Sequence, residues 1–153
     1  WMSEQFGGVV KWEMKELITL KGKKEVWTGT TEAGGRILLS GWIDDVSDFF
    51  DYISLYVQPS VSEGFSLEVL EAVAYGRPVL CSTGAGACDV VPEWYRFEST
   101  NTDELASKIE QIKIRGVAVG VGDPDWQGIA KEYTWDKIRA RYKNLWSGML
   151  KTL

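Results

Sequence analysis

Apolar and polar positions alternate along the chain in a way that separates strand-like from helix-like segments. Short, mostly apolar runs bounded by turn residues are typical of strands, and apolar residues recurring every three or four positions are typical of helices. On this basis we expect strands at residues 25–28, 36–40, 55–57 and 78–82, and helices at residues 12–18, 46–53, 66–75, 102–112 and 134–149. This order predicts an α/β fold, with a Rossmann-like parallel sheet flanked by helices. The strand at residues 36–40 is expected to be buried.

Proline and glycine mark the ends of the central elements. Pro59 ends one strand and Gly64 permits unusual backbone angles, so residues 60–64 are expected to form a loop. The next helix should stop at Gly76, with Pro78 beyond it. Residues 83–87 are small and predict a turn after the following strand, with a helical turn after them. No repeat or linker interrupts the chain, so a single domain over residues 1–153 is expected.

Polar residues mark the starts of three further helices. Asp44 and Asp45, Thr102 and Thr134 are the expected N-caps, because their side chains accept hydrogen bonds from free backbone amides. The glycine-rich segment 116–122 resembles a phosphate loop only superficially, since no Lys followed by Ser or Thr stands at the required place.

Composition excludes several kinds of chemistry. The chain contains no histidine, which excludes Ser-His-Asp and Cys-His nucleophile systems and all histidine metal sites. Its two cysteines, Cys81 and Cys88, match no zinc spacing and are interpreted as reduced thiols. A net charge of −5 argues against a nucleic-acid partner. Any chemistry must then use carboxylates, hydroxyls, lysines, arginines and backbone amides; the expectation of no metal and no cofactor comes from the resemblance described below.

The apolar runs also bear on location. None is long enough to span a bilayer, and the first residues lack the basic start and apolar core of a signal peptide. The expectation is a cytoplasmic protein, or one held peripherally at a membrane.

A candidate anion pocket follows the strand at residues 55–57. The unpaired amides at the start of the next helix, and the helix dipole, favour a negative ligand. The loops at residues 60–64 and 83–87 should lie at the same carboxyl edge of the sheet, where α/β proteins bind ligands. Two adjacent loops suit a diphosphate, although many α/β proteins share such a feature.

Three glutamates lie in or near this pocket. On a helical wheel, Leu67, Val69, Leu70, Val73 and Ala74 share one apolar arc, Glu68 faces solvent, and Glu71 lies at the edge of the arc. A carboxylate at that edge would be partly buried and would need a partner. From spacing alone, Glu63 could merely stabilise the helix N-terminus, and Glu71 could pair with a surface Arg or Lys.

The central motifs resemble glycosyltransferase family 4 and its GT-B relatives. The resemblance rests on Pro59-Ser60, then Glu63 and Glu71 with seven residues between them, then Gly76-Arg77-Pro78-Val79 and the small-residue turn. It covers about residues 36–150, and residues 1–35 match poorly. It implies the C-terminal, donor-binding half of a GT-B fold and a retaining, hexosyltransferase-type enzyme that uses a nucleotide diphosphate sugar without a metal.

The same resemblance implies roles for particular residues. Glu63 would contact the donor sugar near the reacting carbon, as the catalytic residue. The amides of Gly64, Phe65, Ser66 and Leu67 would hold the sugar and the diphosphate. Glu71 would accept hydrogen bonds from the ribose, and Trp42 and Ile43 would lie near the base. Lys21, followed by Gly22, is the candidate for the lysine that the family places near the diphosphate, although the arginine that usually precedes it is missing.

One half of the two-domain fold is absent from this sequence. The resemblance therefore implies an N-terminal acceptor domain or a homo-oligomer partner. The C-terminal helix, with Trp135 and Trp146, is the expected interface, and the acceptor is unknown. Two other functions stay open: a non-catalytic nucleotide-sugar-binding module, and a nucleotide-sugar epimerase of the same fold. The absence of histidine argues against the epimerase.

Overall fold

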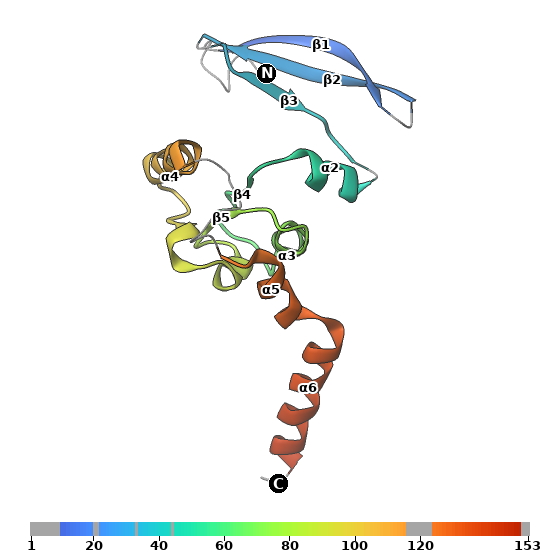
Figure 1. The fold of residues 1–153 in the computed structure, drawn as a ribbon, viewed down its shortest axis with the longest axis vertical. Coiled ribbons are helices and arrows are strands. Elements are labelled where there is room, and N and C mark those ends of the chain that lie inside the picture. The colour runs from blue at the N-terminus through green and yellow to red at the C-terminus, as the bar shows by residue number, and fades with distance from the viewer. Residues whose placement is uncertain (1–9, 20–21, 33, 44, 116–123, 151–153) are drawn as a thin grey trace. The chain divides into compact units, whose positions relative to one another are not determined.

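The structure of the chain is a computed structural model that describes residues 10–19, 22–32, 34–43, 45–115 and 124–150. Residues 116–122, compared above with a phosphate loop, lie outside these ranges. The chain forms two compact units, residues 1–46 and 47–153. Each unit has its own sheet (Figure 1) and is described by itself.

The first unit contains a three-stranded antiparallel sheet in the order β1-β2-β3, with β1 at Val10–Thr19 and β2 at Gly22–Thr31. The predicted helix at residues 12–18 is therefore wrong. Val10, Trp12 and Met14 alternate with Lys11 and other charged residues, which is the two-residue period of a strand. The ion pair between Lys15 and Glu13, two residues apart on one strand, fits this period.

The third strand corrects a second expectation. The strand predicted at residues 36–40 is present as β3 (Arg36–Leu39), and the strand predicted at residues 25–28 lies within β2. However, β3 pairs antiparallel with β2 and lies at the edge of its sheet. Leu38 is 50% exposed and Leu39 is 41% exposed, so the prediction of a buried strand is wrong.

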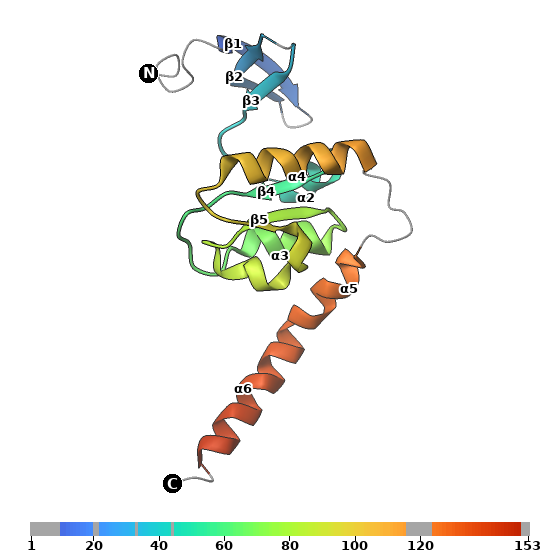
Figure 2. The ribbon, with the colours of Figure 1, turned by 90° about the vertical axis from the view of Figure 1, so that its left-hand side faces the viewer.

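The second unit has the predicted α/β architecture. Its strands β4 (Tyr56–Gln58), β5 (Val79–Ser82) and β6 (Arg96–Phe97) form a parallel sheet with β5 in the centre. Every residue of β5 is buried, as expected for a central strand covered on both faces. Helix α3 lies on one side of this sheet and helix α4 on the other (Figure 2). This unit therefore matches a Rossmann-like domain.

Four of the five predicted helices are present within three residues of their expected bounds, and one expected N-cap differs. The described helices are α2 (Val46–Tyr52), α3 (Leu67–Ala74), α4 (Thr102–Arg115), α5 (Trp126–Ala130) and α6 (Trp135–Leu150), with 3-10 turns η1 (Gly86–Val90), η2 (Glu93–Tyr95) and η3 (Lys131–Tyr133). The sequence patterns did not predict α5 and β6. Asn101, not Thr102, caps α4, because its Oδ1 accepts a hydrogen bond from the Glu104 amide at 3.0 Å.

The core of the second unit forms around β5. Apolar side chains from α2, α3 and α4 pack with the strand and with the turns that follow it, and the largest fully buried ones are Phe50, Leu80, Val69, Val73, Val79 and Val91. Helix α6, in contrast, has no buried residue. Among the helices that the structure describes, none has both the length and the apolar character needed to cross a bilayer.

Candidate functional site

The loops that follow β4 and β5 are joined through their backbones. The Glu63 amide donates to the Gly84 carbonyl at 3.1 Å, and the Gly86 amide donates to the Gly64 carbonyl at 2.8 Å. Glu63 and Ala85 form a parallel bridge between these two hydrogen bonds. The two loops therefore lie side by side at the carboxyl edge of the sheet, as the sequence predicts.

Close approach of the two loops explains their small residues. A Cβ atom at Gly84 would stand 2.1 Å from the Val61 carbonyl oxygen, and one at Gly86 would stand 2.1 Å from the Gly64 carbonyl oxygen. Because each added Cβ would clash with a backbone carbonyl group, no flexible side chain could move aside to relieve the contact. Gly64 itself has open space around it and does not have a positive φ, so the loop at 60–64 does not use the left-handed backbone angles that a glycine permits.

The Glu63 carboxylate is held on one of its two oxygens. Oε2 accepts hydrogen bonds from Ser60 Oγ at 2.8 Å and from Gln58 Nε2 at 2.5 Å. In the part of the chain that the structure describes, Oε1 has no partner. Hydrogen bonds from Ser60, and to a smaller extent the neighbouring Ser66 hydroxyl and the Gln58 amide, hold the pKa of Glu63 below its ordinary value. The carboxylate is therefore exposed, charged and oriented.

The start of α3 is strained and polar groups there are unpaired. Ser66, the N-cap residue, has a φ of 66° and a ψ of 79°, the left-handed region that side chains rarely adopt. Ser66 is only 6% exposed, and its Oγ makes no hydrogen bond of normal geometry. This hydroxyl nevertheless lies near enough to Glu63 to favour the charged form of the carboxylate. Among the described residues, the amides at positions 64–67 donate no hydrogen bond either. Four amides and one buried hydroxyl are thus available to a ligand.

The face of α3 that meets the core differs from the predicted one. Val69, Ala72 and Val73 are buried, whereas Leu67 is 65% exposed and Ala74 is exposed. The predicted arc left out the small Ala72, and the centre of the buried arc lies about 100° from the predicted centre, at 100° per residue. Glu71 then lies nearly opposite the core. The prediction that its carboxylate is partly buried is wrong, and the prediction that Glu68 faces solvent is confirmed.

The remaining predicted donor-binding residues belong to the first unit. Trp42, which is 83% exposed, and Ile43, which is 37% exposed, follow β3. Lys21 lies outside the described residues. The structure thus brings together Glu63 and the amides at 64–67, and the roles of all the predicted site residues, Glu71 included, stay predictions.

Two polar residues of the site were missed by the sequence interpretation. Gln58 is the last residue of β4 and is only 8% exposed, and Ser60 follows Pro59 in the loop. A signal was present, because a glutamine at the end of a short apolar run must find partners when it is buried. Its side chain connects the strand to Glu63.

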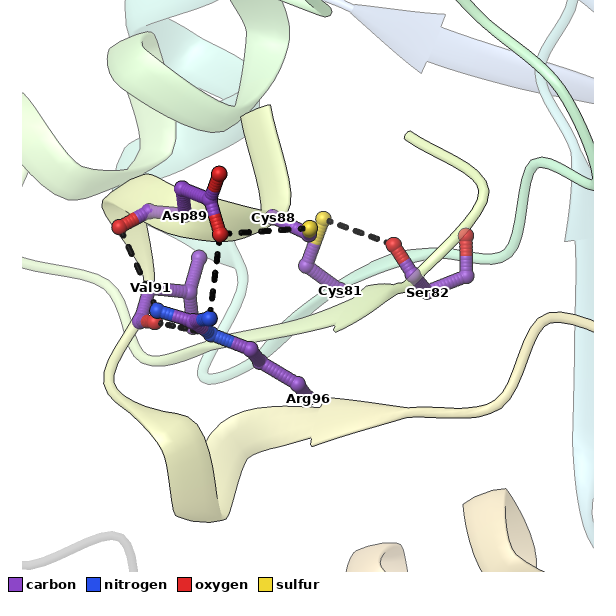
Figure 3. A network of polar contacts seen from close by, with 6 residues as sticks. All are labelled: Cys81, Ser82, Cys88, Asp89, Val91 and Arg96. Carbon is purple, nitrogen blue, oxygen red and sulfur yellow. Dashed lines mark hydrogen bonds and ion pairs between the residues drawn. The ribbon is translucent and has the colours of Figure 1, made fainter. Parts of the chain in front are cut away.

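A second polar network lies behind the small-residue turn (Figure 3). Arg96 Nε donates to the Val91 carbonyl at 2.7 Å, and its Nη1 pairs with Asp89 Oδ1 at 3.1 Å, which ties η1 to β6. Cys81 and Cys88 are both free thiols, and burial above all raises the pKa of Cys81 to about 12. In the described part of the chain, no group of three or more Cys, Asp or Glu side chains could hold a metal ion.

Several relatives among known proteins are named as glycosyltransferases. The chain is 33% identical over 111 residues to a sulfoquinovosyl transferase of Arabidopsis thaliana, covering 69% of this chain and 19% of the relative. It is 29% identical over 110 residues to an uncharacterized glycosyltransferase of Methanocaldococcus jannaschii, covering 67% and 31%. A lipopolysaccharide 1,2-N-acetylglucosaminetransferase of Salmonella typhimurium is 23% identical over 129 residues, covering 81% and 32%. The chain thus spans about a third or less of the length of these relatives. No solved structure matches it significantly.

A family comparison covers most of the described chain. The family described as "Glycosyl transferases group 1" matches residues 12–113, which includes β1, both joined loops and most of α4. The match begins well before residue 36, where the recognisable motifs begin, and so includes the strands of the first unit. That the whole of 1–153 is one nucleotide-sugar-binding domain stays a prediction. The chain belongs to the group 1 glycosyl transferase family.

Proposed function

We propose that this chain is the donor-binding, C-terminal half of a GT-B-fold retaining glycosyltransferase and binds a nucleotide diphosphate sugar at the carboxyl edge of the β4-β5-β6 sheet. The observation that carries the proposal is the combination of one oriented carboxylate with unpaired backbone amides. Glu63 presents a free Oε1, and the amides at 64–67 donate no hydrogen bond among the described residues. A sugar needs acceptors for its hydroxyls and a diphosphate needs donors for its oxygens.

The proposed donor geometry assigns a role to each group. Glu63 accepts hydrogen bonds from sugar hydroxyls near the anomeric carbon, and the amides of Gly64, Phe65, Ser66 and Leu67 hold the sugar and the diphosphate. Glu71, exposed on α3, accepts hydrogen bonds from the ribose hydroxyls. Trp42 and Ile43 contact the base, and Lys21 contacts the diphosphate.

The proposed reaction transfers the sugar with retention at the anomeric carbon and without a metal. As the bond to the anomeric carbon breaks, negative charge develops on the departing diphosphate. Backbone amides at a helix start are fixed donors, and the helix dipole adds about half a positive charge there, so they stabilise that charge without reorganising. Only interactions that strengthen in the transition state accelerate the step.

Transfer needs an acceptor site, which we assign to an N-terminal domain or to a second copy of the chain. The chain spans 31% of the Methanocaldococcus jannaschii relative and 19% of the Arabidopsis one. Helix α6 offers an apolar surface for such a partner, because Trp135 is 82% exposed and Trp146 is 66% exposed. A hollow on α6 is lined by residues of this one helix, so it is an open surface feature rather than an enclosed pocket.

A second candidate is a binding module that holds the nucleotide sugar and catalyses nothing. The described residues favour it because the groups that they bring together, Glu63 and the amides at 64–67, suit a donor and can bind it without an acceptor. Binding without transfer by this chain, and transfer after addition of the missing domain, would separate the two functions.

Calorimetric titration tests the donor site directly. The chain is titrated with UDP, GDP and ADP and with their glucose or mannose conjugates. One base should bind saturably, and Glu71→Ala should weaken that binding by about 1–3 kcal/mol, the cost of a lost hydrogen bond to a charged group. Glu68→Ala is the matched control, because Glu68 is an exposed glutamate of the same helix with no proposed role.

The position of Glu63 predicts a different pattern. Glu63→Ala should reduce the affinity for the sugar nucleotide and leave the affinity for the bare nucleoside diphosphate unchanged. Equal losses for both ligands would argue against the sugar-facing role. If no nucleotide bound to the unaltered chain, the donor-site assignment would be wrong for this chain on its own.

A further inference from the structure

The amide of Gln58 connects the end of β4 to the candidate site. Its Oε1 accepts a hydrogen bond from the Tyr56 hydroxyl at 2.8 Å, and its Nε2 donates to Ser60 Oγ at 2.8 Å and to Glu63 Oε2 at 2.5 Å. Tyr56 and Gln58 are two residues apart on the strand, so their side chains share one face. Three hydrogen bonds thus use both ends of a nearly buried amide.

Tyr56 determines which end of the amide faces the carboxylate. Both hydrogens of Nε2 are used by Ser60 and Glu63, so the phenol is the donor to Oε1. Burial above all raises the pKa of Tyr56 to about 12, which keeps the phenol protonated and able to donate. A flipped amide would place its oxygen against the oxygen of a charged carboxylate, with no hydrogen between them.

Both donors converge on the same carboxylate oxygen. Ser60 Oγ accepts from Gln58 and donates to Glu63 Oε2, so Gln58 acts on Glu63 directly and also through Ser60. One oxygen of an exposed side chain is thereby fixed, and the free oxygen, Oε1, is fixed with it. An exposed glutamate without such contacts would sample several rotamers.

We propose that Gln58 is a positioning residue, oriented by Tyr56, that holds Glu63 so that its Oε1 meets a hydroxyl of the donor sugar. The inference rests on the proposed function and deepens it, because it names the residues that create preference for a sugar nucleotide over a bare nucleoside diphosphate. Gln58 touches no ligand. It acts by fixing the geometry and the charge of the carboxylate that does.

Gln58→Glu tests the proposal through a pH profile. At neutral pH the substitution places two carboxylates in contact. Such a pair loses its protons in two steps, and the higher of the two apparent pKa values lies above the ordinary range of a glutamate. The preference for sugar nucleotide over nucleoside diphosphate should fall about tenfold, the effect of losing one hydrogen bond to a charged group. On acidification one proton enters the pair, the introduced carboxyl group can donate as the Gln58 amide does, and the preference should recover. The unaltered chain should show no such recovery.

The titration of Glu63 without ligand supplies an independent readout. Carbon-detected NMR of the carboxyl groups, assigned by comparison with Glu63→Gln, should give a pKa below the ordinary value in the unaltered chain and a raised apparent pKa in Gln58→Glu. Tyr56→Phe removes only the hydroxyl that orients the amide. It should move the Glu63 pKa towards its ordinary value and reduce the sugar preference less than Gln58→Glu does, and it provides the test if Gln58→Glu does not fold. Glu68→Gln, an exposed change on α3, is the control for altered charge.

The outcomes separate this inference from the proposed function. Suppose that the unaltered chain binds its sugar nucleotide. The role of Gln58 alone would then be overturned by an unchanged Glu63 titration in Gln58→Glu, or by an unchanged sugar preference in both variants. Absence of nucleotide-sugar binding to the unaltered chain would overturn the proposed function and the positioning role together. Recovery of the preference on acidification in Gln58→Glu supports both.

Discussion

The contact between the two loops predicts that Gly86→Ala is strongly destabilising. The added Cβ would stand 2.1 Å from the Gly64 carbonyl oxygen, and real Cβ atoms essentially never approach closer than 3.0 Å, so the backbones must separate by about 1 Å. Overpacking of this kind costs about 1–3 kcal/mol. Weakening the Gly86–Gly64 and Glu63–Gly84 hydrogen bonds adds about 0.5–1.5 kcal/mol each. The lower entropy of the unfolded alanine chain offsets about 0.4–1 kcal/mol, which leaves a net loss of about 3 kcal/mol at the middle of these ranges.

Gly64→Ala is the matched control for this prediction. It makes the same chemical change on the facing loop, where the added Cβ would have nothing within 4 Å. Neither glycine has a positive φ, so backbone strain does not separate the two variants. Only the lower entropy of the unfolded alanine chain remains, so the free energy of unfolding of Gly64→Ala should stay unchanged or rise by up to about 1 kcal/mol.

Urea unfolding followed by circular dichroism measures the difference between the two variants. Gly86→Ala should lower the midpoint without changing the slope, since the surface exposed on unfolding is the same. A thermal scan should place its Tm roughly 6–12 °C below that of Gly64→Ala. Equal stability of the two variants would refute the close approach of the loops and, with it, the described geometry of the candidate site.

Three further predictions follow from individual side chains. A thiol reagent should modify Cys88 quickly and Cys81 only as the chain unfolds, because burial raises the pKa of Cys81 to about 12, and Cys88→Ser should remove the fast phase. Ultraviolet titration should show a tyrosine with a pKa near 12 that is missing in Tyr56→Phe. Because the pKa in the folded chain exceeds the ordinary value of 10.0, the stability that the neutral phenol contributes is complete below pH 10.0. That stability is lost as the pH rises towards 12. Ser66→Gly should raise the free energy of unfolding, measured in urea, by about 1 kcal/mol because it relieves left-handed strain. The same variant should bind a sugar nucleotide more weakly in calorimetry. Lower stability would contradict the strain argument.

Local sequence signals predicted the central part of the chain well. Pro59, Gly76 and Pro78 mark real boundaries, and Gly76 has the φ of 71° that a glycine after a helix permits. The parallel sheet and the two adjacent loops follow from short apolar runs separated by small residues. These features depend on neighbours in the sequence, which a pattern can read.

Features that depend on distant partners were not predictable in the same way. Strand β1 was predicted as a helix because Leu17 and Ile18 interrupt the two-residue alternation and mimic a helical face. The buried arc of α3 was displaced because a small alanine can occupy a close-packed position that hydrophobicity alone does not reveal. Gln58 was overlooked because its importance comes from Glu63 and Tyr56, which only the fold brings into contact with its amide.

The start of α3 differs from those of α4 and α5 in a way that favours a ligand there. Asn101 caps α4 and Asp125 caps α5, each by accepting a hydrogen bond from a backbone amide three residues later. At the start of α3, Ser66 takes a strained φ, its hydroxyl makes no hydrogen bond of normal geometry, and among the described residues the amides at 64–67 find no acceptor. Strain of about 1–2 kcal/mol and unpaired buried groups persist in proteins mostly where function requires them. A diphosphate sugar would supply acceptors for those donors, so the places where this chain departs from ordinary capping are the places where the proposed donor binds.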